Sequence, residues 1–308
     1  MNILFLGGGK RVSLAERFIE AGLELGLDVN VFSYELEKNV PFTIVGEVII
    51  GKLWNDKGIY VDLQKIIIEK KISIVIANVD SATIVLSKLS ESFPELNMIT
   101  SSTKICEIFL DKKLMSDSCE RYGIKSIPLT NDDYPIFAKP RKGSASKGIH
   151  LIKDQSFKNY VNTIIVNSDY IFQKYIDGVE YTVDAYVSKN SKFIGAIPRI
   201  RTSVSSGEST VATVIDDKEI IEQTKIILST YNLIGPLTLQ FIRKNDELYF
   251  LELNPRFGGG VIASIQAGFN IPKIMLQDFL GVGLSPLKNY KPLVMTRCYR
   301  EEFHAIDN

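Results

Sequence analysis

The stretch from Leu251 to Gly260, which reads LELNPRFGGG, constrains the fold of this chain more than any other. A strand-like run from Pro236 to Arg243 precedes it, and the polar residues 244–247 lie between the two. Two such runs around a polar turn are typical of a β-hairpin. Because side chains alternate between the two faces of a strand, we expect Glu252 and Asn254 on the same face.

Gln240, on the first strand of the hairpin, joins that face if it stands opposite Glu252, which requires an odd number of residues in the hairpin loop. The face then carries one carboxylate and two amides. Oxygen ligands of this kind suit Mg²⁺, which binds through one or two carboxylates and takes the rest of its shell from water and phosphates. Arg256 follows the strand, and its guanidinium suits a developing phosphoryl charge. The alternative is an ordinary hairpin with polar residues on its wet face.

The chain has 308 residues, more than one average domain, so we expect two or three lobes. Its 36 Lys and Arg residues balance 36 Asp and Glu residues, which argues against nucleic-acid or membrane binding through bulk charge. Three scattered cysteines and two histidines make no zinc-binding spacing and favour a reducing cytoplasm. We expect no signal peptide and no membrane-spanning helix.

Strand and helix patterns alternate over the first hundred residues. Strands are expected at 2–6, 28–33, 48–51, 72–77 and 98–100, and helices at 12–25, 61–70 and from residue 80 to 89. This alternation predicts a parallel sheet with helices on both faces, a Rossmann-like lobe.

The loop Gly7-Gly8-Gly9-Lys10-Arg11 follows the first expected strand. It does not match the G-x-G-x-x-G pattern of dinucleotide sites, because Val12 stands at the third glycine position. Two interpretations remain: the amides of Gly8 and Gly9 bind a small anion, or the loop is a tight turn that serves only the fold. Asp80 is likewise either a ligand contact at the sheet edge or the cap of the next helix.

The rest of the chain alternates less regularly. We expect strands at 124–128, 136–139, 150–152, 170–175, 180–188, 192–198, 236–243 and 295–303, helices at 101–122, 157–166, 217–231 and 271–280, and a polar loop at 203–209. The segment 140–149 carries three cations in a Gly/Ser-rich loop between two strands. It is typical of a phosphate-clasping hairpin loop, or else is a surface turn.

Taken together, these motifs resemble the ATP-grasp superfamily, most closely its carbamoyl-phosphate-synthase-like branch. The resemblance rests on Lys139 before the Gly/Ser loop, on residues 173–181 (QKYIDGVEY), and on residues 252–256 (ELNPR), and it covers nearly the whole chain. It implies an α/β ATP-grasp fold with a Rossmann-like pre-ATP-grasp domain at 1–105 and an ATP-grasp domain at 106–308. The latter would comprise a lid subdomain at about 112–172 and a metal and substrate subdomain at about 173–308.

The resemblance also implies where ATP binds. Lys112 and Lys139 would contact its phosphates beneath a lid formed by Gly143 to Gly148. The nucleotide-binding set that follows from the resemblance is Lys112, Lys139, Gly143, Ser144, Ser146, Gly148, Gln173, Lys174, Tyr175, Ile176, Glu180 and Gln240. Within it, the backbone of Lys174 and Ile176 would recognise adenine, and Glu180 would bind the ribose.

For the chemistry, the resemblance implies that Gln240, Glu252 and Asn254 bind Mg²⁺, with Mn²⁺ as the alternative, and that Arg256 and Lys139 stabilise the transferring phosphoryl group. Gln240 departs from the carboxylate that many members carry there, and Gln173 from a common glutamate. Neither departure removes the core set.

Three further features concern the substrates. Arg199 and Arg201 share a strand face and would bind a substrate carboxylate, or else pair with a surface acid. The amides of Gly258 to Gly260 could dock a carboxylate. We interpret His150 and His304 as structural.

The implied reaction activates a carboxylate with ATP as an acyl-phosphate, couples it to an amine, and releases ADP and phosphate. The partners are then a small-molecule acid and amine, without nucleic acid or membrane, and a homodimer is a possible assembly. One alternative is a carbamoyl-phosphate-synthase-like kinase of bicarbonate or carbamate that works with a glutaminase partner. The other is a non-catalytic ATP-binding subunit.

Overall fold

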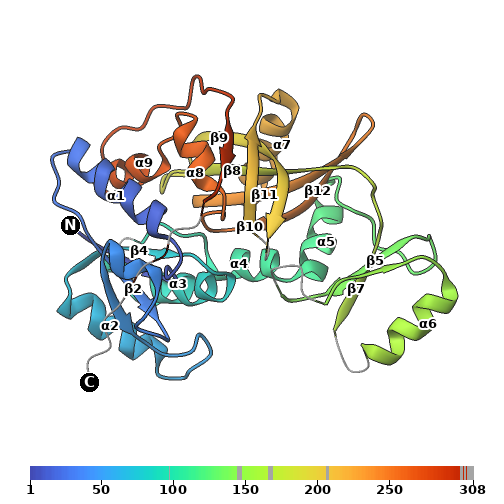
Figure 1. The fold of residues 1–308 in the computed structure, drawn as a ribbon, viewed down its shortest axis with the longest axis horizontal. Coiled ribbons are helices and arrows are strands. Elements are labelled where there is room, and N and C mark those ends of the chain that lie inside the picture. Colours follow the sequence, from blue (N-terminus) through green and yellow to red (C-terminus); the bar gives the residue numbers. More distant parts are fainter. Residues whose placement is uncertain are drawn as a thin grey trace.

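A computed structural model describes residues 1–96, 98–143, 148–165, 169–205, 208–298, 301 and 303, with only the backbone described at 204–205 and 208–209. Three sheets build the molecule: a four-stranded N-terminal sheet, a six-stranded large sheet and a three-stranded small sheet. The N-terminal sheet lies at one end and the small sheet at the other, with the large sheet between and above them (Figure 1).

The N-terminal sheet is parallel throughout, in the order β3-β2-β1-β4, so the predicted parallel sheet is confirmed. Its elements are β1 (Asn2–Leu6), α1 (Val12–Glu24), β2 (Asn30–Glu35), η1 (Pro41–Ile44), β3 (Glu47–Ile50), α2 (Ile59–Glu69), β4 (Ile72–Ala77), α3 (Asp80–Ser92) and η2 (Pro94–Leu96). Ile3 and Phe5 of β1 pack with α1, whereas Leu4 and Leu6 pack with α2 and α3. Helices therefore cover both faces.

The strand predicted at 98–100 is wrong. These residues join no sheet, and the backbone beyond them turns toward the segment before the large sheet. There the hydroxyl of Ser101 donates to the carbonyl of Ile234 and accepts from the amide of Ile234, both at 3.0 Å. The segment is thus a connection between sheets, and the Ser101 side chain bonds it to Ile234, far away in the sequence.

The large sheet is antiparallel, in the order β12-β11-β8-β9-β10-β13. Its strands are β8 (Val179–Val187), β9 (Phe193–Ser205), β10 (Glu208–Val214), β11 (Gly235–Lys244), β12 (Glu247–Asn254) and β13 (Val294–Thr296). The helix α7 (Lys218–Thr230) packs Ile220, Ile227 and Leu228 on one face. Two further helices, α8 (Val261–Gln266) and α9 (Ile271–Phe279), pack into the core that also holds α1.

The polar loop predicted at 203–209 is wrong where it is described. β9 continues to Ser205, and β10, which the sequence pattern did not predict, begins at Glu208. The two strands pair from Ser205–Glu208 to Arg199–Val214 with two register shifts, so backbone pairing overrides the serine-rich composition. The final strand is shorter than predicted, because β13 pairs with only three residues of β10; much of the remainder of 295–303 lies outside the described residues.

The small sheet has the order β6-β5-β7, with β5 (Ile136–Pro140), β6 (His150–Ile152), β7 (Tyr170–Lys174) and the helix α6 (Gln155–Ile164). Before it, the single helix predicted at 101–122 is two helices, α4 (Thr103–Leu110) and α5 (Lys112–Arg121). The break is at Asp111, whose extended backbone lets its carboxylate cap α5 by accepting from the amides of Lys113 and Leu114.

The strand predicted at 124–128 is reduced to a single bridge, Ser126 to Phe250. Two of its carbonyls bond to different sheets: Lys125 O accepts from the amide of Phe250 in the large sheet, and Pro128 O accepts from the amide of Lys174 in the small sheet. The segment therefore crosses from the large sheet to the small sheet and runs along neither. The domain limits at 105, 112 and 172 stay predictions.

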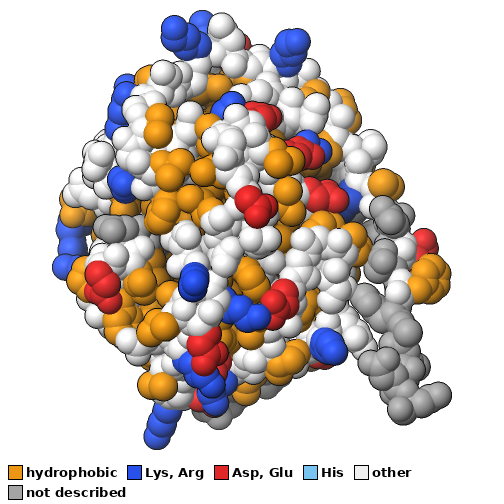
Figure 2. Space-filling view, turned by 90° about the vertical axis from the view of Figure 1, so that its left-hand side faces the viewer, with side chains coloured by type: hydrophobic (Ala, Val, Ile, Leu, Met, Phe, Trp, Pro, Cys, Tyr) orange, Lys and Arg blue, Asp and Glu red, His pale blue; other side chains and the backbone are white. Residues whose placement is uncertain are grey.

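On the face of the molecule shown in Figure 2, basic and acidic side chains are interspersed among hydrophobic ones, so neither charge dominates there. Within the described part of the chain, no helix combines the length and the apolar character that crossing a membrane would require.

Candidate functional site

A cavity of about 920 Å³ opens where the three sheets meet. Its walls come from the start of α3, from α4 and α5, from β5 and β7, and from four strands of the large sheet. All the predicted site residues that the structure describes line this cavity except Gly148; Ser144 and Ser146 lie outside the described residues. Segments far apart in the sequence thus converge on one space.

The hairpin of β11 and β12 forms the floor of the cavity, and its geometry corrects one prediction. Its loop holds two residues, Asn245 and Asp246, and not an odd number. Gln240 nevertheless stands opposite Glu252, because the register shifts by one residue at Leu251. Such a β-bulge sets two residues of one strand against one of its neighbour, and it supplies the odd residue that the loop lacks.

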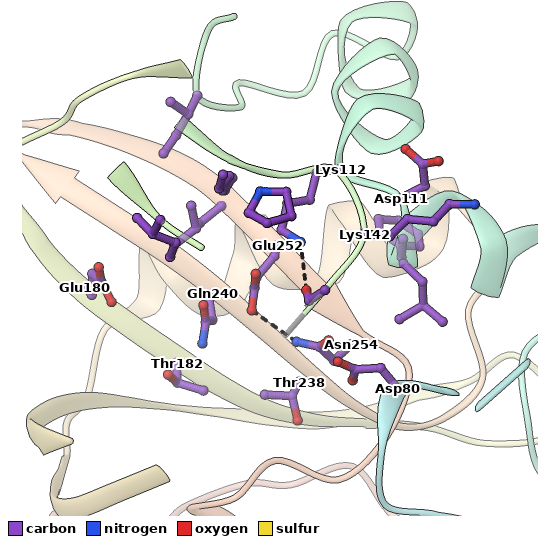
Figure 3. A pocket seen from close by; sticks show the side chains of 18 of the residues that line it. Asp80, Asp111, Lys112, Lys142, Glu180, Thr182, Thr238, Gln240, Glu252 and Asn254 are labelled. Carbon is purple, nitrogen blue, oxygen red and sulfur yellow. Dashed lines mark hydrogen bonds between the residues drawn. The ribbon is translucent and has the colours of Figure 1, made fainter. Parts of the chain in front are cut away.

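Cross-strand pairing arranges polar side chains in two rows on the cavity side of the large sheet. One row is Glu252, Gln240, Thr182 and Arg199, and the other is Asn254, Thr238 and Asp184. Figure 3 shows how Glu180, Gln240, Glu252 and Asn254 follow these strands, with Thr182 and Thr238 in the same group. The sheet thus presents a polar face to the cavity at a point where most sheets would be apolar.

Glu252 is the centre of this face. Asn254 Nδ2 donates to Glu252 Oε1 at 3.3 Å. With its amide oriented to suit both neighbours, Gln240 donates to the same oxygen at 3.0 Å and accepts from Arg201 Nη1 at 3.3 Å. The three predicted metal ligands are therefore in contact, around a single carboxylate.

Lys139 of β5 reaches toward this carboxylate from the small sheet. Its side chain is buried, and its ammonium donates no hydrogen bond to any described residue. Burial lowers the pKa of Lys139 to about 8, with nearby Glu252 and Glu180 opposing the shift and Lys112 adding to it. A buried cation without a hydrogen-bonded partner is costly, so this position favours an anionic ligand.

The two arginines of β9 differ in their surroundings. Arg199 is 2% exposed, and its Nε donates to Asp184 Oδ2 at 2.9 Å, an oxygen that also accepts from Ser264 Oγ at 2.7 Å. Arg201 is half-buried, and burial lowers the pKa of its guanidinium, opposed by Glu180. Arg199 lines the cavity and forms a buried ion pair with Asp184, so this partner is not a surface acid.

Arg256 turns toward the N-terminal sheet. Its Nε and Nη2 both contact Asp80 Oδ1, at 2.6 and 2.5 Å, and its Nη1 donates to the carbonyl of Phe257 at 3.1 Å. Asp80 is the first residue of α3 and accepts no capping hydrogen bond. The cap interpretation of Asp80 is therefore wrong, and the residue acts across the cavity.

The start of α5 and the Gly/Ser loop lie together on the opposite side. Lys112 Nζ donates to the carbonyl of Gly143 at 2.8 Å, as Figure 3 shows. Arg141 Nε donates to both oxygens of Asp111, at 2.6 and 2.8 Å. Although burial opposes it, these hydrogen bonds and the helix amides lower the pKa of Asp111. Gly148 has a φ of +69° and stands against Tyr170.

One end of the cavity is apolar. Ile127, Ile176, Ile242 and Leu251 form a small cluster there, and all four line the cavity. Beside it, Gln173 Nε2 donates to the carbonyl of Ile127 at 3.3 Å.

Three polar groups of Lys174 and Tyr175, at the end of β7, already have partners within the chain. The amide of Lys174 donates to Pro128 O and that of Tyr175 to Pro135 O, while Lys174 Nζ pairs with Asp133 at 2.7 Å. The amide of Ile176 donates to none of the described residues.

The loop from Gly7 to Arg11 is filled by the protein itself. The amide of Gly8 donates to Ser33 Oγ at 3.1 Å, and that hydroxyl donates to Glu35 at 2.6 Å. Burial raises the pKa of the Glu35 carboxyl, against hydrogen bonds from Ser33 and from the amides of Gly9 and Gly8. The carboxyl group that occupies this loop is therefore that of Glu35, which favours the interpretation of the loop as a tight turn that serves only the fold.

Residues 167–298 match the family described as "ATP-grasp in the biosynthetic pathway with Ter operon". The carbamoyl phosphate synthase large chain of Agathobacter rectalis is 30% identical over 135 residues, which is 40% of this chain and 13% of that protein. The D-alanine–D-alanine ligase of Petrotoga mobilis is 29% identical over 140 residues, 40% of this chain and 46% of that protein.

Solved structures match nearly the whole chain. N5-carboxyaminoimidazole synthetase from Staphylococcus aureus, complexed with ADP, has a TM-score of 0.77 at 20% identity over 96% of this chain and 82% of that one. The biotin carboxylase domain dimer of Hydrogenobacter thermophilus 2-oxoglutarate carboxylase, with MgADP and bicarbonate, has a TM-score of 0.76 at 16% identity over 96% of this chain and 74% of that one.

This chain has the ATP-grasp fold. The N-terminal parallel sheet and the two later sheets are the ATP-grasp arrangement that the sequence motifs indicate. Several ATP-grasp site features were not predicted from the motifs, namely the partner of Asp80, the bulge at Leu251 and the hydroxyl of Thr182. The Thr182 hydroxyl is buried in the cavity without a hydrogen-bond partner among the described residues.

The residues present fit a divalent cation of the Mg²⁺ type. Among the described residues, no group of three His, Cys, Asp or Glu side chains is placed to hold a metal ion. Mg²⁺ requires less, since one or two carboxylates suffice when phosphates complete its shell. Glu252 with the amides of Asn254 and Gln240 is such a donor set, provided that the Gln240 amide turns its oxygen inward.

Proposed function

We propose that this protein is an ATP-dependent ligase that activates a carboxylate as an acyl-phosphate and couples it to an amine. One observation carries the proposal: the carboxylate Glu252, with its two amides, faces the buried ammonium of Lys139 across one cavity. A purely structural cavity would gain nothing from a desolvated cation beside a carboxylate that it does not contact.

In this proposal ATP lies across the cavity with its base in the apolar end. Adenine stacks among Ile127, Ile176 and Leu251, and its ring accepts from the amide of Ile176. The amide of Lys174 is already bonded to Pro128, so the Lys174 carbonyl is the group left to accept from the adenine amine. Glu180 binds the ribose, and the phosphates extend toward Lys139.

Lys112, Lys139 and the loop from Gly143 to Gly148 bind the phosphates. Glu252, Asn254 and Gln240 would hold Mg²⁺, which would supply positive charge beside the phosphate oxygens. Support comes from the similar structures, one solved with ADP and one with MgADP. Arginine and lysine side chains are well suited to the charge that spreads over the phosphoryl oxygens during transfer.

The substrate carboxylate attacks the γ-phosphorus, the bond from that phosphorus to ADP breaks, and an acyl-phosphate results. The amine nitrogen then attacks the acyl carbon, the bond to phosphate breaks, and the nitrogen loses a proton to solvent. Lys139 and Arg256 contact the phosphoryl oxygens in the first step. Arg201, beside Gln240, orients the acid.

The test is phosphate release from ATP and Mg²⁺ with pairs of carboxylic and amino acids, combined with hydroxylamine trapping of the acyl-phosphate. We expect one pair to give turnover and Glu252→Gln to abolish it. Glu247→Gln is the matched control, because Glu247 lies on the same strand, outside the cavity, paired with Lys125 at 2.8 Å. ATP hydrolysis that is equal in the wild type and Glu252→Gln would contradict the proposal.

A second candidate is phosphorylation of bicarbonate. It is favoured by the similarity to carbamoyl phosphate synthase large chains and to a biotin carboxylase domain solved with bicarbonate. The same assay separates the two, since phosphate release that depends on bicarbonate and needs no amine supports the second. The dimer of that carboxylase domain also supports a homodimer here, which light scattering tests.

A further inference from the structure

The segment from Arg256 to Gly260 is held by three side chains from distant parts of the sequence, two of which lie outside the cavity. Arg11, in the N-terminal glycine loop, donates through Nη1 to the carbonyl of Gly258 at 3.3 Å. Arg297, just after β13, donates through Nη2 to the carbonyl of Gly259 at 2.6 Å. Asp80 accepts from Arg256 at 2.6 Å. Only Asp80 among the three lines the cavity, whereas all three glycines do.

The two carbonyl contacts determine where two amides point. The only cis peptide bond among the described residues precedes Pro135, so the peptide bonds of this segment are trans. In a trans peptide plane the N–H and C=O point in opposite directions. An arginine that holds the carbonyl of Gly258 away from the cavity therefore aims the amide of Gly259 toward it. Arg297 does the same for the amide of Gly260.

These amides are available to a ligand. Neither the amide of Gly259 nor that of Gly260 donates a hydrogen bond to a described residue. Two neighbouring amides aimed at one point stabilise negative charge on an oxygen without reorganising during a reaction. The two amides can stabilise such a charge only if both point toward the oxygen that carries it.

Asp80 fixes the charged side chain of the same segment. Both contacting nitrogens of Arg256 meet one carboxylate oxygen, so the guanidinium is held at a single point by a residue of α3. The ion pair is partly exposed, with side-chain exposures of 15% for Arg256 and 22% for Asp80. The orientation of Arg256 is therefore set by the N-terminal part of the chain.

We propose that Arg11, Asp80 and Arg297 are positioning residues, which orient the guanidinium of Arg256 and the amides of Gly259 and Gly260 for the reaction. This inference rests on the proposed function of the same cavity. It gives one residue of the Gly7–Arg11 loop a role in the reaction, because the guanidinium of Arg11 reaches the second glycine segment. The N-terminal sheet contributes through this contact as well as through Asp80.

The test compares the variants Arg11→Gln, Asp80→Asn and Arg297→Gln with the wild type. We expect kcat to fall on the order of 10- to 100-fold, because displacement of a reacting group by about 1 Å has that effect. The dissociation constant of a fluorescent ATP analogue should stay within about twofold, since the base and ribose contacts are distant. Arg11→Lys and Arg297→Lys should restore part of kcat.

Lys10→Gln is the matched control, because Lys10 is exposed in the same loop and takes no part in these contacts. Equal losses of kcat and of nucleotide affinity, or an unchanged kcat in all three variants, would overturn the inference. A variant that melts far below the wild type is judged by its Lys or Asp80→Glu counterpart.

A readout without turnover separates this inference from the proposed function. In a double-mutant cycle of Asp80→Ala and Arg256→Ala, thermal unfolding measures the coupling between the two side chains whatever the reaction is. If no substrate pair gives phosphate release, the proposed function fails. A coupling of zero then overturns the inference as well, whereas a clear coupling retains the orientation of Arg256.

Discussion

Two runs of three glycines each follow a strand, but the backbone groups of the two runs are bonded differently. Residues 7–9 follow β1 in the N-terminal sheet, and residues 258–260 follow β12 in the large sheet. In the first run the amide of Gly8 is bound by Ser33, and Glu35 fills the loop. In the second run, the amides of Gly259 and Gly260 bind no described residue, while the carbonyls of Gly258 and Gly259 are held by arginines.

The difference shows that a glycine run does not by itself indicate a ligand site. What matters is whether its donors are already used within the chain. The same distinction separates two charged groups of the site: Asp111 is bound by Arg141 and by helix amides, whereas Lys139 has no hydrogen-bonded partner among the described residues. In each of these two comparisons, one member has its polar groups bonded within the chain, whereas the other has them available to a ligand. Substitutions should therefore affect the two members differently.

The largest effect is expected in the available glycine run. A Cβ at position 260 would lie 2.7 Å from Arg199 Nη1, and Arg199 cannot move aside because it is buried and bound to Asp184. Gly260→Ala should therefore reduce kcat by on the order of 100-fold while ATP binding persists. Gly283→Ala is the control, since its Cβ would meet nothing within 4 Å. A kcat within threefold of the wild type would place the reaction elsewhere.

Lys139 should give the next largest effect. Loss of a charge-assisted contact of about 1.5–3 kcal/mol corresponds to an affinity loss of roughly 10- to 100-fold for Lys139→Ala. Since the pKa of Lys139 is lowered to about 8, the free protein loses this charge as the pH rises through 8, and ATP affinity should fall there.

Calorimetry in two buffers at pH 8.5 checks this dependence. The wild type should take up protons on binding ATP, and Lys139→Arg should take up none at the same affinity, because arginine stays protonated. Equal proton uptake in both proteins would show that another group titrates.

A smaller effect, and one confined to stability, is expected in the satisfied glycine run. A Cβ at Gly8 would lie 2.6 Å from Phe5 Cβ and 2.9 Å from Ser33 Oγ. Gly8→Ala should lower the free energy of unfolding by about 1–3 kcal/mol, as overpacking does. Urea unfolding measures this, and kcat per folded molecule should stay unchanged. A selective loss of kcat would mean that the strain at Gly8 also displaces Arg11 from Gly258.

The smallest effect is expected at Asp111. Its lowered pKa means that it stabilises the folded protein above the ordinary pKa of an aspartate, and that this stability is lost as the pH falls through the folded value. Asp111→Asn should cost about 1–2 kcal/mol at pH 7, and less below about pH 4. Asp117→Asn, at an exposed ion pair of the same helix, should cost little. Matching pH profiles of the two variants would exclude the role assigned to Arg141.

Local patterns allowed much of the fold and of the site to be predicted. The alternation of strands and helices predicts the N-terminal sheet, and the two motifs on β8 and β12 predict which side chains share the cavity. Both signals are short-range, since Glu252 and Asn254 are two residues apart on one strand. The strand β10, which reads ESTVATV, was missed because the serines at 203–209 indicated a loop, although its valines and threonines suit a strand that pairs with β9.

Long-range contacts could not be predicted in this way. Asp80 and Arg256 are 176 residues apart, and Arg11 and Gly258 are 247 residues apart. No local pattern relates such residues, because their proximity depends on how two sheets pack. The bulge at Leu251 is a further case, since it depends on how β11 and β12 pair and leaves no mark in the alternation of either strand.

Because of that bulge, the number of residues in the hairpin loop does not by itself fix which face of the sheet Glu252 occupies. Because Leu251 absorbs the odd residue within the strand, the turn at Asn245 and Asp246 can stay short. If Leu251 were paired in plain alternation instead of bulged, it would stand opposite Gln240, and Glu252 would turn to the other face, toward the core packed under α7. A leucine without polar atoms thus decides on which side of the sheet the carboxylate stands.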